Sequence, residues 1–328
     1  MYMEQVIIIG AGPCGLSAAC ELQKQGVNPL IIDKGCIVNS IYHFPTFMQF
    51  FSTPQLIEIG DVPFTTIQDK PSRHEGLNYY RMIAERKELR IHQYEKVEQV
   101  TQFGDHFKIF TKDRLGNELQ YEAQHVIVAT GYYDNPNLLN IPGEELAKVS
   151  HYFKEAHPYV GLKIAVVGLK NSAVDTAMEL QRCGAEVTVI HRNDHISDSV
   201  KKWVRPLFES LIEKEKINMM WNAELKEIKN DAIVIEQNGV TQEMDNDFVF
   251  AMTGYHPDHS FIQSMGVGIN EETGAPTFHE ETMETNVKSL YIAGVLAAGN
   301  NANSIFIENG RFHGKWIAKD IVKKLNVS

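Results

Sequence analysis

Cysteine is scarce in this chain. Its 328 residues include four cysteines, Cys14, Cys20, Cys36 and Cys183, and no two of them form a Cys-x-x-Cys pair. So few unpaired thiols cannot build a disulfide scaffold, and zinc ribbons need closely spaced cysteine pairs. The sequence therefore predicts neither a disulfide-stapled protein nor a metal site.

Long apolar runs and an excess of positive charge are missing too. No apolar stretch approaches the roughly 20 residues that span a bilayer, and the N-terminus lacks the pattern of a secretory signal. The formal net charge of −11 repels nucleic acid phosphates and anionic lipids. We expect a cytoplasmic protein that binds neither nucleic acid nor membrane. The sequence leaves the oligomeric state open, a homo-oligomer included.

The chain does contain one structural unit twice. GAGPCGLSAACELQKQGVNPLIIDK (10–34) aligns with GLKNSAVDTAMELQRCGAEVTVIHR (168–192). Each copy follows an apolar run, VIIIG or IAVVG, and ends in a second one. A strand, a glycine turn, a helix and a strand in this order are typical of dinucleotide binding. We expect both copies to bind nucleotides; the alternative is two such units without a ligand, because a fold alone does not determine function.

Short alternating segments follow each copy. They predict one small antiparallel meander per half: 97–103, 106–112 and 118–124 in the first, and 225–230, 232–237 and 240–245 in the second. Each half then closes with a strand that ends in Thr-Gly-Tyr, in HVIVATGYYDNP (125–136) and FVFAMTGYHPDH (248–259).

The C-terminal tail has no counterpart in the second half, so we expect it to return to the first. The predicted fold is α/β, with two dinucleotide-binding, Rossmann-like domains, one inserted into the other. Residues 1–157 and 284–328 form the outer domain, and residues 158–283 form the inserted one.

The first glycine turn suits the adenosine half of FAD. Gly12 lets the backbone approach a pyrophosphate, and Pro13 suits the opening of a helix whose N-terminus favours negative charge. Asp33 ends the second strand, where a carboxylate accepts hydrogen bonds from a ribose diol. Gly10 and Gly15 complete the glycine pattern. NAD would satisfy the same residues.

The second copy has lost this acid. His191 takes the place of Asp33, and Arg192 follows it. A carboxylate would repel the 2′-phosphate of NADPH, whereas arginine binds it through charge-assisted hydrogen bonds. Further candidate phosphate contacts lie at the glycine turn: Gly168, Lys170, Asn171 and Ser172. We expect NADPH here, against the alternative that His191 and Arg192 are merely solvated. A hydride donor in this domain favours FAD as the acceptor in the other.

With these features the chain resembles two-dinucleotide-domain flavoproteins of the thioredoxin reductase type, and more closely the bacillithiol-disulfide reductase family. The resemblance rests on GAGPCG (10–15), NSIYHFPTFMQFFST (39–53), VVGLKNSAVDTA (166–177), HR (191–192) and IFIENGRFHG (305–314). It implies an FAD enzyme that uses NADPH to reduce the disulfide of a low-molecular-weight thiol, bacillithiol disulfide above all. Cys14, inside the first glycine turn, would be the catalytic thiol.

Further cofactor contacts are expected by the same resemblance. They are Lys34, Ser40, Thr130, Gly131, Gly294 and Val295 for FAD, and Thr253 and Gly254 for NADPH. Val295 stands where related flavoproteins carry an aspartate for the ribityl chain, so the contacts there must differ. Near the flavin we expect backbone between Asn303 and Ile305, rather than the side chains of Glu308 or His313, to stabilise charge that develops on reduction.

Cys14 admits two interpretations. The positive end of the helix favours a thiolate, whereas an adjacent pyrophosphate disfavours a second anion. The residue is either the thiol that exchanges with the substrate or a small packing residue; we predict the thiol. Cys183 is expected to pack, and Cys20 and Cys36 receive no role.

Two other functions share the same plan. Flavin monooxygenases carry an aromatic, glycine and histidine pattern before the NADPH turn, and PGEELAKVSHYF (142–153) does not meet it. A redox sensor that binds both nucleotides without steady turnover needs only the two glycine turns.

Overall fold

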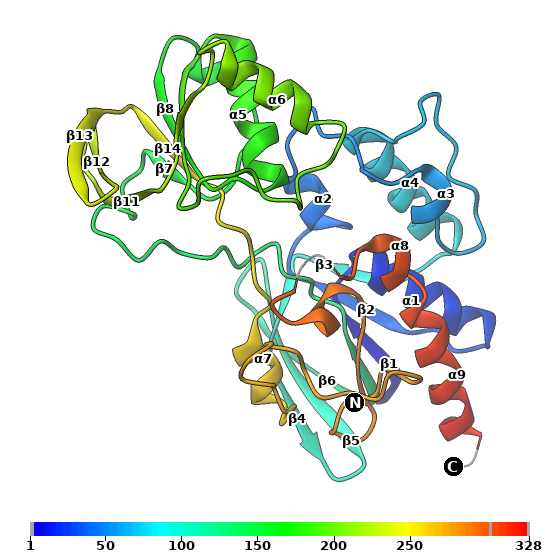
Figure 1. The fold of residues 1–328 in the computed structure, drawn as a ribbon. Coiled ribbons are helices and arrows are strands. Elements are labelled where there is room, and N and C mark those ends of the chain that lie inside the picture. Colours follow the sequence, from blue (N-terminus) through cyan, green and yellow to red (C-terminus); the bar gives the residue numbers. More distant parts are fainter. Residues whose placement is uncertain (1–2, 302–303, 327–328) are drawn as a thin grey trace. The chain divides into compact units, whose positions relative to one another are not determined.

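The computed structural model describes residues 3–301 and 304–326. The chain forms two compact units. The outer unit comprises Met1–Asn135 and Tyr255–Ser328, and the inserted unit comprises Pro136–Gly254 (Figure 1). The chain crosses between the units after residues 135 and 254. The sequence analysis places these boundaries later, after residues 157 and 283.

Packing of the two connecting segments explains the earlier boundaries. In the inserted unit, β7 (Val149–Ser150) pairs in parallel with β14 (Phe248–Ala251), and Leu146 packs against that unit's core. After the second crossing, α7 (His259–Ser264) contributes Ile262 to the core of the outer unit.

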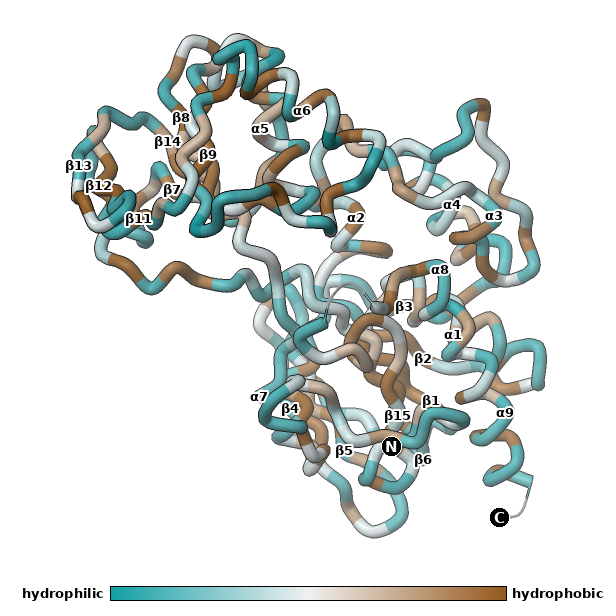
Figure 2. Tube along the Cα trace, in the orientation of Figure 1, coloured by the Kyte–Doolittle hydropathy of each residue, from teal (hydrophilic) through white to brown (hydrophobic). Residues whose placement is uncertain are grey.

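A parallel sheet lies at the centre of the outer unit. Its strands are β1 (Met3–Ile9), β2 (Leu30–Asp33), β3 (Arg90–Gln93), β6 (Glu118–Val128) and β15 (Leu290–Ile292). They run in the order β3-β2-β1-β6, and β15 pairs with β6. The apolar run of β1 is buried at four consecutive positions, as expected of a strand whose two faces are both covered. Figure 2 shows the resulting concentration of hydrophobic residues in these strands.

Both predicted meanders are confirmed. In the outer unit β4 (Glu95–Phe103) and β5 (His106–Asp113) pair antiparallel with each other, and β5 pairs with β6. The last meander strand and the closing strand, predicted separately, are the single strand β6. In the inserted unit β11 (Ala223–Ile228), β12 (Ala232–Gln237) and β13 (Val240–Asp245) form an antiparallel sheet.

The inserted unit repeats the parallel arrangement. β8 (Lys163–Val167), β9 (Glu186–Ile190) and β10 (Asn218–Met220) join β14 and β7 in the order β10-β9-β8-β14-β7. The helices are α5 (Asn171–Cys183) and α6 (Arg205–Glu213), with the 3-10 turn η1 (His157–Tyr159) before β8. The predicted α/β fold with two Rossmann-like halves is confirmed.

The C-terminal tail returns to the outer unit, as predicted. Its helix α9 (His313–Leu325) packs on α1 (Pro13–Lys24) so closely that a methyl group on Gly314 would lie 2.5 Å from Ala18 Cα. The hydroxyl of Ser17 donates to the carbonyl of Arg311 at 2.7 Å. The remaining elements of this unit are α2 (Asn39–His43), α3 (Pro54–Ile57), α4 (Arg73–Arg86), η2 (Gly294–Ala298) and α8 (Ile307–Gly310).

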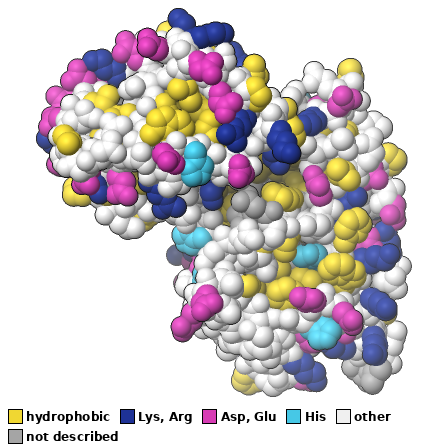
Figure 3. All heavy atoms as spheres, in the orientation of Figure 1, with side chains coloured by type: hydrophobic (Ala, Val, Ile, Leu, Met, Phe, Trp, Pro, Cys, Tyr) yellow, Lys and Arg dark blue, Asp and Glu magenta, His cyan; other side chains and the backbone are white. Residues whose placement is uncertain are grey.

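Charge on the surface is mixed in sign. Acidic side chains alternate with lysine and arginine over the face drawn in Figure 3, despite the net charge of −11. Within residues 3–301 and 304–326, no helix is both long and apolar enough to cross a bilayer.

Candidate functional site

The three glycines of the first turn have three different surroundings. Gly10 has a φ of +110°, and a Cβ there would lie 2.5 Å from the carbonyl oxygen of Ala129. A Cβ on Gly15 would collide with the carbonyl oxygen of Gly10. At Gly12, the N-cap of α1, a Cβ would meet no described atom within 4 Å. Gly10 and Gly15 therefore permit tight packing, and Gly12 faces open space that a diphosphate can approach.

Asp33 braces this turn. Its carboxylate accepts the N–H of Ala11 at 2.6 Å and the N–H of Gly35 at 2.7 Å. Each oxygen keeps a further lone pair for a ribose hydroxyl. Burial raises the pKa of Asp33 above its usual value, although the two backbone N–H groups oppose that shift. The sequence analysis assigned Asp33 to the ribose and missed its bond to the turn.

Cys14 lies between two glycines from the C-terminal part of the chain. A methyl group on Gly294 would lie 2.9 Å from Cys14 Sγ, and one on Gly310 would lie 3.0 Å from the same sulfur. The Gly310 methyl would also lie 3.1 Å from Gly294 Cα, so the two glycines face each other. We call the space around the sulfur, bounded by Gly294 and Gly310, the Cys14 slot. Two glycines are needed because any side chain would fill it.

Burial dominates the electrostatics of this thiol. The Cys14 side chain is partly exposed, yet burial raises its pKa to about 12. The sequence analysis weighed the helix end against the pyrophosphate and left out desolvation, which disfavours any thiolate. At neutral pH Cys14 therefore holds its proton.

The other cofactor contacts predicted in the outer unit come from several elements of that unit. Thr130 and Gly131 directly follow β6, and a Cβ on Gly131 would meet no atom of the described chain within 4 Å. Lys34 forms an ion pair with Asp134 at 2.9 Å. Ser40 lies in α2, and Val295 follows Gly294 in η2. Asn303, where the backbone contact to the flavin was expected to begin, lies outside the described residues.

In the second glycine turn Gly168 repeats the geometry of Gly10. Its φ is +113°, and a Cβ there would lie 2.6 Å from the carbonyl oxygen of Met252. Lys170 is the N-cap of α5 and is exposed, as is Ser172. These two side chains are accessible to a phosphate.

Asn171 already has two hydrogen-bond partners within the chain. Its Nδ2 donates to the carbonyl of Ser199 at 3.0 Å, and its Oδ1 accepts the N–H of Lys201 at 3.0 Å. It is the first residue of α5, and the N-cap Lys170 makes no side-chain capping bond among the described residues. Asn171 holds the 199–201 loop, and its amide is occupied there.

His191 and Arg192 differ in exposure. His191 is half-buried, and burial together with Arg192 lowers its pKa. Its Nε2 is buried and bonds to no other described atom. Arg192 is exposed, so of the two it is the side chain open to a 2′-phosphate.

Thr253 and Gly254, at the end of the inserted unit, bond to its beginning. The Thr253 hydroxyl donates to the carbonyl of Asn137 at 2.5 Å, and the Asn137 N–H donates to the carbonyl of Gly254 at 2.9 Å. The Thr253 hydroxyl and the Gly254 carbonyl therefore already have hydrogen-bond partners within the chain. Cys183, the last residue of α5, packs against the core of the inserted unit as predicted.

Two glycine turns, each between a parallel strand and a helix, define a protein with two dinucleotide-binding units and a single cysteine in the first turn. The chain belongs to the pyridine nucleotide-disulphide oxidoreductase family, whose model matches residues 7–294. Membership makes it an oxidoreductase and implies the use of a flavin and a pyridine nucleotide. The open space at Gly12 and the N-terminus of α1 fit a diphosphate; Val295 offers no carboxylate for a ribityl chain.

Individual proteins that are similar over the full length narrow the comparison within this family. Bacilliredoxin reductase Bdr of Bacillus subtilis is 50% identical over 330 residues, which is 99% of this chain and 100% of that protein. The structure of bacillithiol disulfide reductase Bdr from Bacillus cereus has 53% identity and a TM-score of 0.97, with 98% of this chain and 100% of that chain covered. The Staphylococcus aureus structure of the same name has 46% identity and a TM-score of 0.94, over 99% of both chains. The resemblance inferred from the sequence is confirmed.

Proposed function

We propose that this protein is an NADPH-dependent FAD enzyme that reduces the disulfide of a low-molecular-weight thiol, bacillithiol disulfide. The observation that supports this function most directly is the position of Cys14. Its sulfur lies between Gly294 and Gly310, and the residue is two positions from Gly12, which faces open space for a diphosphate. FAD belongs in the outer unit, beside Gly12 and Asp33. NADPH belongs in the inserted unit, beside Lys170 and Arg192. The bacillithiol disulfide reductases of two bacteria are similar over their full length, which supports the substrate.

The chemistry at Cys14 has two stages. Its sulfur, once deprotonated, attacks one sulfur of the substrate, forming a mixed disulfide and releasing one thiol. Two electrons then cleave this mixed disulfide, restoring Cys14 and releasing the second thiol. When bound, the flavin supplies these electrons from the pyridine nucleotide. Because burial raises the pKa of Cys14 to about 12, the reaction needs a base or a substrate group to take the thiol proton.

Replacement of Cys14 tests this function. Cys14→Ala should bind flavin and accept hydride from NADPH at near the normal rate, since alanine is smaller than the slot. Turnover with bacillithiol disulfide should fall to background, because no mixed disulfide forms. Stopped-flow bleaching of the flavin measures the first half-reaction, and NADPH consumption with the disulfide measures the whole cycle.

Cys36→Ala is the matched control, as Cys36 is a second partly exposed cysteine of the outer unit. It should leave both half-reactions unchanged, and so should replacement of Cys20 or Cys183. Normal disulfide turnover by Cys14→Ala would make Cys14 a packing residue and require a different outlet for the electrons.

Arg192 tests the choice of nucleotide. Arg192→Ala should raise the KM for NADPH on the order of 10- to 100-fold, the loss of one charge-assisted hydrogen bond. The KM for NADH should change little, because NADH has no 2′-phosphate. Exposed Arg182, at the far end of α5 and paired with Glu179, provides the control in Arg182→Ala. Equal use of the two nucleotides by the unaltered protein would argue against NADPH.

The name of the Bacillus subtilis relative supports a second candidate substrate, the disulfide of a bacilliredoxin. The same thiol chemistry at Cys14 would serve it. Parallel assays with bacillithiol disulfide and with an oxidised bacilliredoxin separate the two, since the true substrate gives the larger kcat/KM. Oxygen-dependent NADPH consumption with formation of a flavin hydroperoxide would instead identify a monooxygenase, and flavin reduction without turnover on any disulfide would identify a sensor.

A further inference from the structure

One histidine joins the two walls of the Cys14 slot. The N–H of Gly294 donates to Nδ1 of His313 at 3.2 Å, in a buried hydrogen bond. His313 is 6% exposed, begins α9, and follows the other wall, Gly310, by three residues. The bond therefore connects the turn that carries one wall to the segment that carries the other.

The His313 ring is in the right state to accept a hydrogen bond at Nδ1. Burial lowers its pKa to about 4, so the ring is neutral near neutral pH. A neutral ring that accepts at Nδ1 carries its proton on Nε2. The ring stacks on Trp316, with centroids 5.3 Å apart and planes 22° from parallel, which restrains its rotation.

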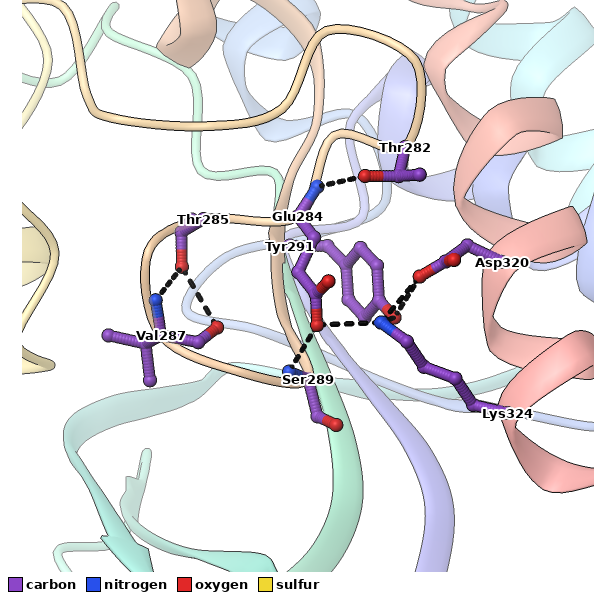
Figure 4. Close-up of polar contacts among 8 residues, drawn as sticks. All are labelled: Thr282, Glu284, Thr285, Val287, Ser289, Tyr291, Asp320 and Lys324. Atoms are coloured by element: carbon purple, nitrogen blue, oxygen red, sulfur yellow. Dashed lines mark hydrogen bonds and ion pairs between the residues drawn. The ribbon is translucent and has the colours of Figure 1, made fainter. Parts of the chain in front are cut away.

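A second connection between the same two segments lies further from the slot (Figure 4). Tyr291, on β15, donates its hydroxyl to Asp320 on α9 at 2.8 Å. Lys324 Nζ lies 2.6 Å from the Asp320 carboxylate and 2.7 Å from that of Glu284. This cluster holds β15 to α9 independently of His313. A change at His313 should therefore act locally, at Gly294, and leave α9 attached.

We propose that His313 is the positioning residue of the Cys14 slot: by accepting the Gly294 N–H, it keeps Gly294 against Gly310 and holds the Cys14 sulfur in one orientation for disulfide exchange. Without the acceptor, a buried N–H is left unpaired and the turn must shift to find another partner. Gly294 has a φ of +77° and, as a glycine, can rotate readily. The slot then widens and the sulfur becomes more accessible to solvent than in the unaltered protein.

Alkylation of Cys14 in the flavin-loaded protein measures the slot directly. His313→Phe keeps a ring of similar size but removes the acceptor. At pH 8, its Cys14 should react with iodoacetamide at least roughly tenfold faster than in the unaltered protein, because a more hydrated thiol ionises more readily. Peptide mass spectrometry assigns the modified cysteine. The kcat for disulfide reduction should fall roughly tenfold, with the KM for NADPH unchanged.

Rescue by asparagine separates positioning from general packing. Oδ1 of an asparagine lies the same number of bonds from the backbone as Nδ1 of histidine, so His313→Asn should restore slow alkylation and most of the turnover. His125→Phe removes another buried histidine of the same unit, on β6, and should leave the alkylation of Cys14 unchanged. If His313→Phe does not fold, His313→Leu makes the same comparison, because leucine also lacks an acceptor.

The proposal rests on the proposed role of Cys14, but the two can fail separately. Unchanged alkylation in His313→Phe, or fast alkylation in His313→Asn, would overturn the role of His313 whatever the substrate. Normal turnover by Cys14→Ala would overturn the proposed function and leave the alkylation result standing.

Discussion

At the scale of single residues, one residue type performs opposite tasks in the first glycine turn. Gly10 and Gly15 are glycines because backbone atoms lie too close for a Cβ, whereas Gly12 has no described atom near the place where its Cβ would be. Gly12 also has ordinary extended backbone angles, φ −72° and ψ 173°, which suit a residue before proline. Its lack of a side chain serves a ligand, and that of the other two serves the fold.

Gly12→Val follows from this contrast. The variant should fold, since a β-branched residue adopts these angles and meets open space, but its side chain should exclude the diphosphate. We expect the affinity for flavin to fall tenfold or more, which corresponds to a loss of about 1.4 kcal/mol of binding free energy or more. Flavin absorbance per chain and thermal unfolding measure the two effects. Gly15→Ala is the control for a glycine that serves the fold. Its Cβ would collide with the carbonyl of Gly10, so this variant should not fold. Full flavin content in Gly12→Val would contradict the assignment.

At the scale of elements, the C-terminal helix completes the site that the first helix begins. α9 contacts α1 at Gly314, carries His313 at its start, and is held to β15 through Asp320 and Lys324. Burial by itself would raise the pKa of Asp320, but bonds from Lys324 and Tyr291 more than offset this and lower it. Asp320 thus stabilises the folded protein in its charged form.

Lys324→Met should therefore destabilise the protein in a pH-dependent way. Removal of the cation leaves a partly buried carboxylate without its strongest partner, which costs about 1–3 kcal/mol at pH 7. A carboxyl whose pKa is lowered by folding stabilises the protein above its ordinary pKa of 3.8, and the contribution is lost as the pH falls through the lowered value. The difference between variant and parent should shrink as acid is added. Denaturant unfolding at several pH values measures this difference. Exposed Lys319→Met, on the same helix, is the control, and a pH-independent difference would indicate lost packing instead.

At the scale of the whole molecule, the two crossings between the units lie side by side. In the outer unit the N–H of His256 donates to the carbonyl of Asn135 at 2.9 Å, and the rings of Tyr133 and Tyr255 lie 4.8 Å apart. The outer unit has its own hydrophobic core, separate from those of the inserted unit. Its two segments could thus be joined directly.

Replacement of residues 136–254 by a short glycine linker between Asn135 and Tyr255 should leave the outer unit folded and yellow. The adjacent ends need no long loop, so the entropic cost of closure is small. The product should be reduced by dithionite but not by NADPH, because the nucleotide-binding unit is gone. Circular dichroism, flavin absorbance and anaerobic titration measure these properties. Reduction by NADPH at the parent rate would show that the outer unit binds the pyridine nucleotide itself.

The amino-acid sequence by itself determined the repeated strand-turn-helix unit, the insertion of one half in the other, and the family. These features depend on contacts between neighbours in the chain: the apolar period of a strand, the steric needs of a glycine turn, the charge at a strand end. Only the tertiary structure decided that Gly294 and Gly310 bound the Cys14 slot, that His313 joins them, that Asn171 is occupied by a loop, and that burial governs the thiol. Each of these depends on segments brought together by packing from distant parts of the chain, and desolvation exists only once that packing has excluded water.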